Sequence, residues 1–176
     1  MISLPEPDQR TSEDVGAFAQ RCGLELLRFA YLLCGDRQRA EDLLQDVLLA
    51  MHRRFPNVLT LDNPVGYARR ALANANVSRA RRASSTEVVV DRFPDGAAAD
   101  GPDAAERDLL WQALRRLPVR QRTVLVLRFY VDASDRDIAD ALGCRLGTVR
   151  SLASRGLAAL RTDSSLQLDA SDGGAR

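Results

Sequence analysis

Hydrophobic residues recur every three or four positions along most of this chain, which is the spacing of amphipathic helices. A first helix is predicted over residues 12–33, with Gly35 as its terminator. Its apolar positions are Val15, Phe18, Cys22, Leu26, Phe29 and Leu33. A second helix is predicted over residues 39–55, where Pro56 breaks the pattern. Its apolar positions are Leu43, Leu44, Val47, Leu48 and Met51.

The third predicted helix opens at Asn63-Pro64, where a capping residue precedes a proline at the first helical position. It extends to about Arg82. Between Asn63 and Thr86 the chain has no acidic residue, whereas arginines are frequent. These arginines are Arg69, Arg70, Arg79, Arg81 and Arg82. The helix is therefore a basic island within a chain of nearly balanced charge.

The composition changes over residues 83–104, which are rich in alanine, glycine, aspartate and proline and are typical of a flexible linker. The run 88–90 of three valines within it is compatible with a short strand or with docking on a helix. Helices resume over residues 103–117 and 118–130. Residues 1–11 and 162–176 are polar end segments, for which no packed structure is expected.

The last helical pair, Ser134 to Leu160, has the layout of a helix-turn-helix. Ser134 is placed to cap the first helix, with Asp137 in a weak capping box, and Gly143 is placed to end it. The second helix is predicted over residues 147–160. Its packing side is predicted to hold Val149, Leu152, Ala153, Gly156, Ala159 and Leu160. Its opposite side is predicted to hold Gly147, Thr148, Arg150, Ser151, Ser154 and Arg155.

This second helix has the charge distribution of a DNA-reading helix. From Ala141 to Thr162 there is no acidic residue, while four arginines occur: Arg145, Arg150, Arg155 and Arg161. Because the net charge of the whole chain is only +1, affinity for nucleic acid has to come from such local patches. The alternative is a solvated surface helix, but surface helices usually carry both signs of charge.

Composition excludes several other classes of protein. The chain has three widely spaced cysteines and a single histidine, His52, so it offers no metal-binding cluster, and no metal or cofactor is expected. Free cysteines on apolar helix faces fit the reducing cytoplasm. The sequence has neither a signal-peptide pattern nor an apolar run of membrane-spanning length, so no membrane association is expected.

Three segments together carry a family resemblance: GDRQRAEDLLQDV, the helix entry NPVGY, and the run LPVRQRTVLVLRFY that precedes IADALGCRLGTVRS. Over residues 14–161 the chain resembles the bacterial extracytoplasmic-function sigma factors, group IV of the sigma-70 family. The resemblance implies an all-α fold of two small helical domains joined by a flexible linker. A region-2-like domain is expected at 12–82 and a region-4-like helix-turn-helix domain at 105–161.

The resemblance also implies which residues bind, and none is expected to be catalytic. The expected contacts with the promoter −35 element are Arg145, Thr148, Arg150, Ser151, Ser154 and Arg155. The expected contacts with the −10 element, through the loop 57–62 and the helix after it, are Asp62, Asn63, Tyr67, Arg69, Arg70 and Asn74. The expected contacts with core RNA polymerase are Glu41, Asp42, Gln45, Asp46 and Arg53.

The implied partners are core RNA polymerase, through its beta-prime clamp helices and beta flap, promoter DNA and an anti-sigma factor. The implied location is the bacterial cytoplasm, in association with the nucleoid. An alternative is a free-standing helix-turn-helix regulator in which residues 12–82 sense a ligand or dimerise, although a basic helix at 63–82 is unusual in a sensor domain. An enzyme is the least supported class, because the chain has no phosphate-binding GxxxxGK[ST] loop and no nucleophile elbow.

Overall fold

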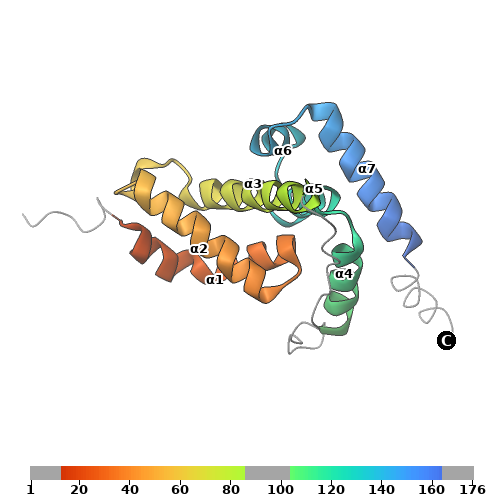
Figure 1. Ribbon diagram of the computed structural model, residues 1–176, viewed down its shortest axis with the longest axis horizontal. Helices are drawn as coiled ribbons and strands as arrows, with labels where there is room; N and C mark the ends of the chain where they lie inside the picture. The colour runs from red at the N-terminus through yellow and green to blue at the C-terminus, as the bar shows by residue number, and fades with distance from the viewer. Residues whose placement is uncertain (1–12, 86–103, 164–176) are drawn as a thin grey trace, which may run out of the picture.

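A computed structural model of the chain describes residues 13–85 and 104–163, which form seven α-helices and one short 3-10 helix (Figure 1). The helices are α1 (Val15–Cys34), α2 (Arg37–Arg54), η1 (Val58–Thr60), α3 (Pro64–Ser85), α4 (Ala104–Arg116), α5 (Val119–Tyr130), α6 (Asp135–Leu142) and α7 (Leu146–Thr162). The expected all-α fold class is therefore confirmed for the described residues.

Aspartate caps explain where the first two helices begin. Asp14 accepts a hydrogen bond from the backbone N–H of Ala17 at 2.8 Å, so α1 begins at Val15 and not at residue 12 as predicted. In the same way Asp36 accepts from the N–H of Arg39 at 2.8 Å, so α2 begins two residues before the predicted start. Between them Gly35 ends α1 as predicted, with a left-handed φ of 72°.

Helices α1, α2 and α3 form the N-terminal module around large apolar side chains. In Figure 1, α1 and α2 lie side by side and the longer α3 crosses them. The largest fully buried side chains here are Phe18, Leu26, Phe29, Leu33, Leu43, Met51, Val58 and Leu72. The predicted cap of α3 is also confirmed, because Asn63 Oδ1 accepts from the N–H of Gly66 at 2.8 Å. This module holds the loop and the helix for which the family resemblance implies contact with the −10 element.

Helices α5, α6 and α7 form the C-terminal helix-turn-helix module. Ser134 caps α6 by accepting from the N–H of Asp137 at 3.1 Å, and Gly143 ends it with a φ of 57°, both as predicted. A Cβ atom added at Gly156 would lie 2.9 Å from Leu125 Cδ1, so glycine at this position permits the close crossing of α7 over α5. The small core of this module includes Ile138, Val124 and Val149.

The two modules contact each other. Helix α5 packs on α1 and α3, and α6 lies against α3 (Figure 1). The Trp111 ring of α4 meets Tyr31 of α1 edge-on, with centroids 4.9 Å apart. Arg122 of α5 is only 3% exposed, and its Nη1 would lie 3.3 Å from a Cβ added at Gly35. A buried guanidinium thus approaches the carboxyl end of α1, where helical carbonyl groups favour positive charge.

Several predictions concern segments outside the described residues. The predicted linker falls mostly in 86–103, and the valine run lies within that range. The residues 1–11 and most of the segment 162–176 fall outside as well. The domain boundaries that depend on these segments therefore stay predictions.

Candidate nucleic-acid interface

The second helix of the helix-turn-helix, α7, presents the polar side that its sequence predicts. The residues that share this side are half-buried at Thr148 and exposed at Arg145, Arg150, Ser151, Ser154 and Arg155. The opposite side packs as predicted at Val149, Leu152, Ala153 and Gly156, which are buried. Ala159 is the exception, because it is exposed near the end of the helix. The structure thus brings the six expected −35 contacts onto one helix and its entry.

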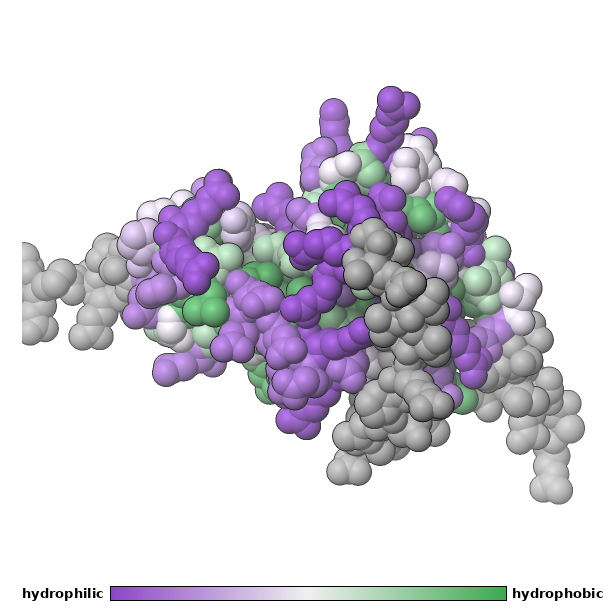
Figure 2. Space-filling view, in the orientation of Figure 1, coloured by the Kyte–Doolittle hydropathy of each residue, from purple (hydrophilic) through white to green (hydrophobic). Residues whose placement is uncertain are grey.

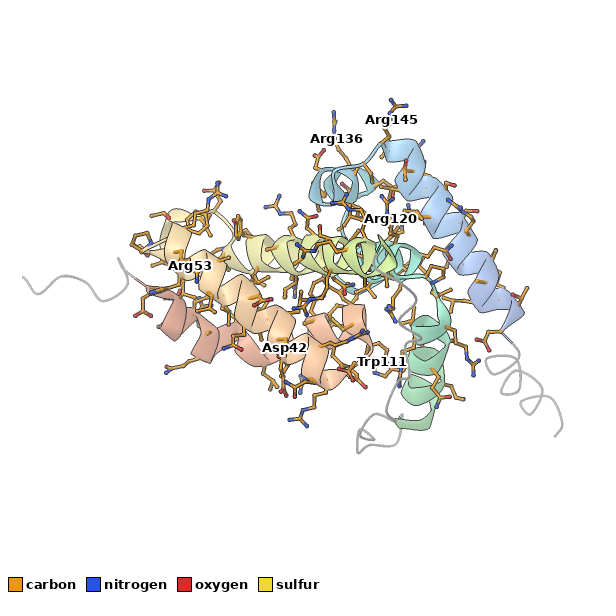
Figure 3. The ribbon with its side chains drawn as sticks, viewed as in Figure 1. Asp42, Arg53, Trp111, Arg120, Arg136 and Arg145 are labelled. Atoms are coloured by element: carbon orange, nitrogen blue, oxygen red, sulfur yellow. The ribbon has the colours of Figure 1, made fainter. Side chains whose placement is uncertain are left out.

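The arginines on α7 differ in how they are held. Arg155 donates within its own helix, to the Ser151 hydroxyl at 3.2 Å and to the Ser151 carbonyl at 3.3 Å. Arg150 Nε lies 3.5 Å from a carboxylate oxygen of Asp135 on α6. Arg145 caps α7 without a side-chain hydrogen bond and projects away from the body of the protein (Figure 3). The helix therefore offers guanidiniums with different degrees of constraint to an approaching duplex.

Arg136 was missed by the sequence reasoning. It lies at the start of α6, is exposed, and projects away from the body of the protein in the same direction as Arg145 (Figure 3). Figure 2 shows the same part of the surface as hydrophilic side chains that stand above α6 and the start of α7. The first helix of a helix-turn-helix crosses the DNA backbone, so a cation at its start is placed for phosphate contact. That docking rule was the signal that could have identified Arg136.

On α3, four of the expected −10 contacts share one side of the helix at the spacing of i, i+4, i+7 and i+11. These residues are Asn63, Tyr67, Arg70 and Asn74. The backbone N–H of Tyr67 donates to the Asn63 carbonyl at 2.9 Å. The half-buried Tyr67 ring packs edge-on against Phe55, with centroids 5.1 Å apart, and Asp62 is exposed just before the cap.

Arg69 lies on a different side of α3 from this group. It forms an ion pair with Glu25 of α1, and its side chain is 26% exposed. Arg79 is also tied to a neighbouring helix, because its Nη2 lies 3.2 Å from Asp46 of α2. The basic island of α3 is therefore divided between cations that face outward and cations that connect helices.

The loop before α3 is fixed by the beginning of α1. Asn57 Oδ1 accepts from the N–H of Glu13 at 3.1 Å and from that of Leu59 at 3.0 Å. The N–H of Val58 donates to the Glu13 carbonyl at 2.8 Å, and the Val58 side chain is fully buried. In contrast, Leu59 and Thr60 are exposed. The beginning of α1 thus holds the loop at Asn57 and Val58, while the tip at Leu59 and Thr60 faces the solvent. Sequence reasoning gave Asn57 no role.

The five expected polymerase contacts all lie on α2, where Glu41 is half-buried and the others are exposed. Asp42 and Arg53 stand near opposite ends of the helix (Figure 3). Glu41 pairs with Arg37 at 2.9 Å on the same helix, while Asp42 accepts from Gln38 at 3.2 Å. The predicted buried positions Leu43, Leu44, Val47 and Met51 are confirmed.

An apolar groove of about 420 Å³ borders these polar residues on α2. It lies between α1 and α2, and it is lined by Val15, Gly16, Ala19, Leu27, Glu41, Leu44, Gln45, Leu48, Leu49 and His52. Leu49 is 46% exposed and lies on the same side of α2 as the five expected polymerase contacts, which together form a polar stripe. An exposed leucine between charged residues was the available signal for this surface, and the sequence reasoning did not use it.

Two of the three described cysteines, Cys22 and Cys34, are buried. All three are free, and burial raises the pKa of the Cys34 thiol to about 11. A neutral buried thiol is a poor nucleophile. Within residues 13–85 and 104–163 no group of three or more potential ligands is arranged for a metal. No helix in the described part of the chain has the length and apolar character to cross a membrane.

These features define a two-module helical protein whose C-terminal module is a DNA-binding helix-turn-helix. Comparison with protein families agrees with both modules. The model for sigma-70 region 2 matches residues 18–86, and the model for sigma-70, region 4 matches residues 107–160.

The chain is also similar to individual sigma factors. It is 36% identical over 147 residues to the RNA polymerase sigma-E factor of Streptomyces avermitilis, covering 82% of each chain. It is 34% identical over 139 residues to the ECF RNA polymerase sigma factor SigM of Mycobacterium tuberculosis, covering 77% of this chain and 69% of that protein. Among solved structures, the sigma factor RpoE of Bartonella quintana, in complex with the anti-sigma factor NepR, has a TM-score of 0.62 at 25% identity. That match covers 86% of this chain and 98% of RpoE.

The chain therefore belongs to the extracytoplasmic-function sigma factors of the sigma-70 family. As a sigma factor it binds core RNA polymerase and DNA and directs promoter-specific initiation of transcription, without being an enzyme itself. Because the family matches cover both modules, they favour a sigma factor over a free-standing regulator.

Proposed function

We propose that α7 reads the promoter −35 element, that the loop 57–62 and α3 engage the −10 element, and that α2 binds the beta-prime clamp helices of core polymerase. The observation that carries this proposal is the exposed, acid-free side of α7. Neither basic surface needs high affinity alone, because polymerase tethers both and raises their effective concentration at the promoter.

For the −35 element the supporting argument is the chemistry of the major groove. An arginine makes two hydrogen bonds to a guanine there, and each such pair contributes about 1–3 kcal/mol of discrimination. Recognition helices use the residues near their N-terminus for base contacts. Arg145, Thr148 and Arg150 occupy that part of α7, while Ser154 and Arg155 lie one turn further and suit phosphate contact.

For the −10 element the supporting argument is a rigid loop next to a cationic helix face. An extruded base requires a preformed pocket with hydrogen-bonding groups, and the neighbouring single strand requires cations. In this proposal the anchored loop, with Leu59 and Thr60 exposed at its tip, receives the base, and the side of α3 that carries Arg70 and Asn74 receives the neighbouring strand. Arg69 is paired with Glu25 of α1, so in this proposal it holds α3 against α1 and does not contact the DNA strand itself.

For polymerase the support is a polar stripe beside an apolar groove on α2. Stable protein interfaces combine an apolar centre with a polar rim. Leu49 and the groove would form that centre, with Glu41, Asp42, Gln45, Asp46 and Arg53 around it. A contact of the C-terminal module with the beta flap belongs to the same proposal.

An anti-sigma factor is a further proposed partner, because the similar RpoE was solved with NepR bound. Such a protein would hold the sigma factor inactive by covering its polymerase-binding or DNA-binding surfaces. The proposed place of action is the bacterial cytoplasm, at the nucleoid.

The test is run-off transcription by purified core polymerase with this chain, on fragments from upstream of its own gene. We expect specific initiation that is lost when Arg150 and Arg155 are both changed to alanine. The matched control is Arg28→Ala on α1 combined with Arg120→Ala on α5, which removes the same charge from exposed positions outside α7. Retained binding to polymerase by the α7 variant, measured by gel filtration, separates a DNA defect from an assembly defect.

Failure of the chain to bind core polymerase, together with retained duplex binding, would contradict the roles given to α2. Specific initiation that survives the double substitution on α7 would contradict the role given to that helix. A substitution of Leu49 by glutamate is expected to weaken polymerase binding without altering duplex DNA binding by the isolated chain.

A further inference from the structure

A single carboxylate connects the three helices of the C-terminal module. Asp135 is the first residue of α6 and is held in an ion pair by Arg128 of α5. Its other carboxylate oxygen lies 3.5 Å from Nε of Arg150 on α7. The side chains of Asp135 and Arg128 are each 26% exposed, whereas that of Arg150 is 68% exposed. A half-buried anion therefore stands behind an exposed cation on the DNA-facing helix.

The two contacts of Asp135 differ in kind. The contact with Arg128 is the closer one, and it fixes the carboxylate between α5 and α6. The contact with Arg150 is longer than an ordinary hydrogen bond and acts mainly through charge. Because it meets the Nε side of the guanidinium, the two terminal nitrogens remain available. Those are the nitrogens that an end-on approach would use on O6 and N7 of a guanine.

We propose that Asp135 is a positioning residue that holds Arg150 in the orientation for reading one base pair of the −35 element. This inference rests on the proposed role of α7. A long arginine side chain without a neighbour samples many rotamers, and it can satisfy a phosphate as well as a base. A fixed anion on one edge of the guanidinium restricts that choice and directs its free edge outward.

The same carboxylate weakens non-specific attraction, because a negative charge close to the duplex repels its phosphates. Asp135 thus exchanges general affinity for selectivity at one position. A purely structural role, in which Asp135 only joins α5 to α6 through Arg128, would leave base preference at that position unchanged. Base preference is therefore the property that distinguishes the two roles.

The experiment is a selection of promoter duplexes by the full chain bound to core polymerase. The duplex pool derives from the region upstream of the chain's own gene, with the −35 element randomised. The DNA that the complex retains is sequenced. Four proteins are compared: the unaltered chain, Arg150→Ala, Asp135→Asn and Arg128→Gln. The Arg150→Ala protein identifies the base pair that Arg150 reads, since its preference is lost there.

At that base pair we expect Asp135→Asn to reduce the preference about three- to tenfold, a part of what a bidentate arginine–guanine pair supplies. Preferences at other positions should persist, which also shows that the variant is folded, and retention of random DNA should rise. Arg128→Gln should reduce the preference less than Asp135→Asn does, because it removes the anchor of the carboxylate on α5 but leaves the charge of Asp135 on α6 beside Arg150.

The outcomes separate the two levels of the proposal. If Arg150→Ala changes the preference at no position, the role proposed for α7 fails. If Arg150→Ala erases one position while Asp135→Asn leaves it sharp, only the role of Asp135 is overturned. If Arg128→Gln blurs that position as much as Asp135→Asn does, the effect comes from the joint between α5 and α6, and Asp135 is not a positioning residue.

Discussion

The two modules hold the arginines of their DNA-facing helices in different ways. On α3 of the N-terminal module, Arg69 is paired with Glu25 of α1 and Arg79 with Asp46 of α2. On α7 of the C-terminal module, Arg155 donates to Ser151 of its own helix, and Arg150, although 68% exposed, lies 3.5 Å from Asp135 of α6. Arg69 and Arg79 of α3 therefore join helices, while Arg150 and Arg155 of α7 are exposed to solvent.

This difference reflects how each module makes its core. The N-terminal module buries large side chains between three long helices, and its arginines lie where those helices meet. The C-terminal module has a small core, and α7 packs on α5 and α6 through its apolar side, while Arg150 on its polar side lies near Asp135 of α6. Substitution of Arg69 or Arg79 should therefore lower stability, whereas substitution of Arg155 on α7 should affect mainly DNA binding.

The largest expected effect comes from an arginine that breaks this rule. Arg122 belongs to α5, yet it is buried against the end of α1 and donates to the Arg115 carbonyl at 3.4 Å. Arg122→Ala should lower the free energy of unfolding by about 2–4 kcal/mol, because it removes a buried side chain and its hydrogen bond to the Arg115 carbonyl. Urea denaturation followed by circular dichroism measures this change.

The matched control is Arg120→Ala, two residues earlier on the same helix. Arg120 is exposed (Figure 3), so its loss should change stability by less than about 0.5 kcal/mol. Equal effects of the two substitutions would show that α5 does not pack on α1 in solution. The separation between a structural arginine and exposed arginines in this module would then disappear.

The next effect concerns the end of α1, where Cys34 is buried against α3, and it appears at alkaline pH. Burial raises the pKa of Cys34 from an ordinary value of 9.0 to about 11, so folding favours the protonated thiol. This contribution is fully present below pH 9 and is lost as the pH rises through 11. The free energy of unfolding should therefore fall by about 2–3 kcal/mol between these values. Urea titrations at several pH values measure the slope.

Cys34→Ala is the control for this prediction, because it removes the titrating group. It also removes the Cys34 thiol contact with Asn76 Oδ1 at 3.6 Å, so its stability at neutral pH should be lower. Between pH 9 and 11 the decline should be smaller than in the unaltered chain by the amount stated above. If the free energy of unfolding fell equally with pH in both proteins, the thiol would be hydrated in solution, and α1 and α3 would be separated there.

The sequence predicted much of this architecture because caps and apolar periodicity are local signals. Gly35, Gly143 and Ser134 act as their residue types suggest, and the predicted polar and apolar sides of α7 hold except at Ala159. The family resemblance supplied the function of the chain. Its site residues stay predictions, although their exposure on the expected surfaces supports most of them.

What the sequence did not predict depends on contacts between distant segments. Glu25 and Arg69 are 44 residues apart, so nothing local indicated that this arginine faces α1. The buried position of Arg122 and the anchoring of Asn57 by Glu13 are also long-range effects. An arginine in a basic stretch is counted as a DNA contact until its partner is known. The N-terminal module was for this reason harder to predict than α7.

A smaller effect is expected at the loop that the N-terminal module presents. Asn57→Ala removes the acceptor for two backbone N–H groups, and it should cost about 1–2 kcal/mol of stability. Promoter melting should fall more than duplex binding, because the loop tip loses its support while α7 is unaffected. Permanganate reactivity of unpaired thymines measures melting, and a mobility-shift assay with double-stranded promoter DNA measures binding.

Asn57→Asp is the control for stability, because its carboxylate keeps an acceptor for both N–H groups. It should retain most of the stability that Asn57→Ala loses. Equal loss of duplex binding and melting in Asn57→Ala would instead place the defect in assembly with polymerase. The loop would then have no role that differs from that of α7.

The smallest effect gives the most direct test of the comparison, because it uses two neighbouring arginines of α3. Arg69→Ala should lower the free energy of unfolding by up to about 1 kcal/mol, the range of partly exposed ion pairs, with little change in DNA binding. Arg70→Ala should leave stability within about 0.5 kcal/mol. For binding to single-stranded −10 DNA, it should also reduce the slope of log K against log salt concentration by about 0.7 in magnitude, because one phosphate contact is lost. If both substitutions reduce the salt dependence equally, Arg69 leaves Glu25 when DNA binds, and the distinction between joining and reading arginines within α3 fails.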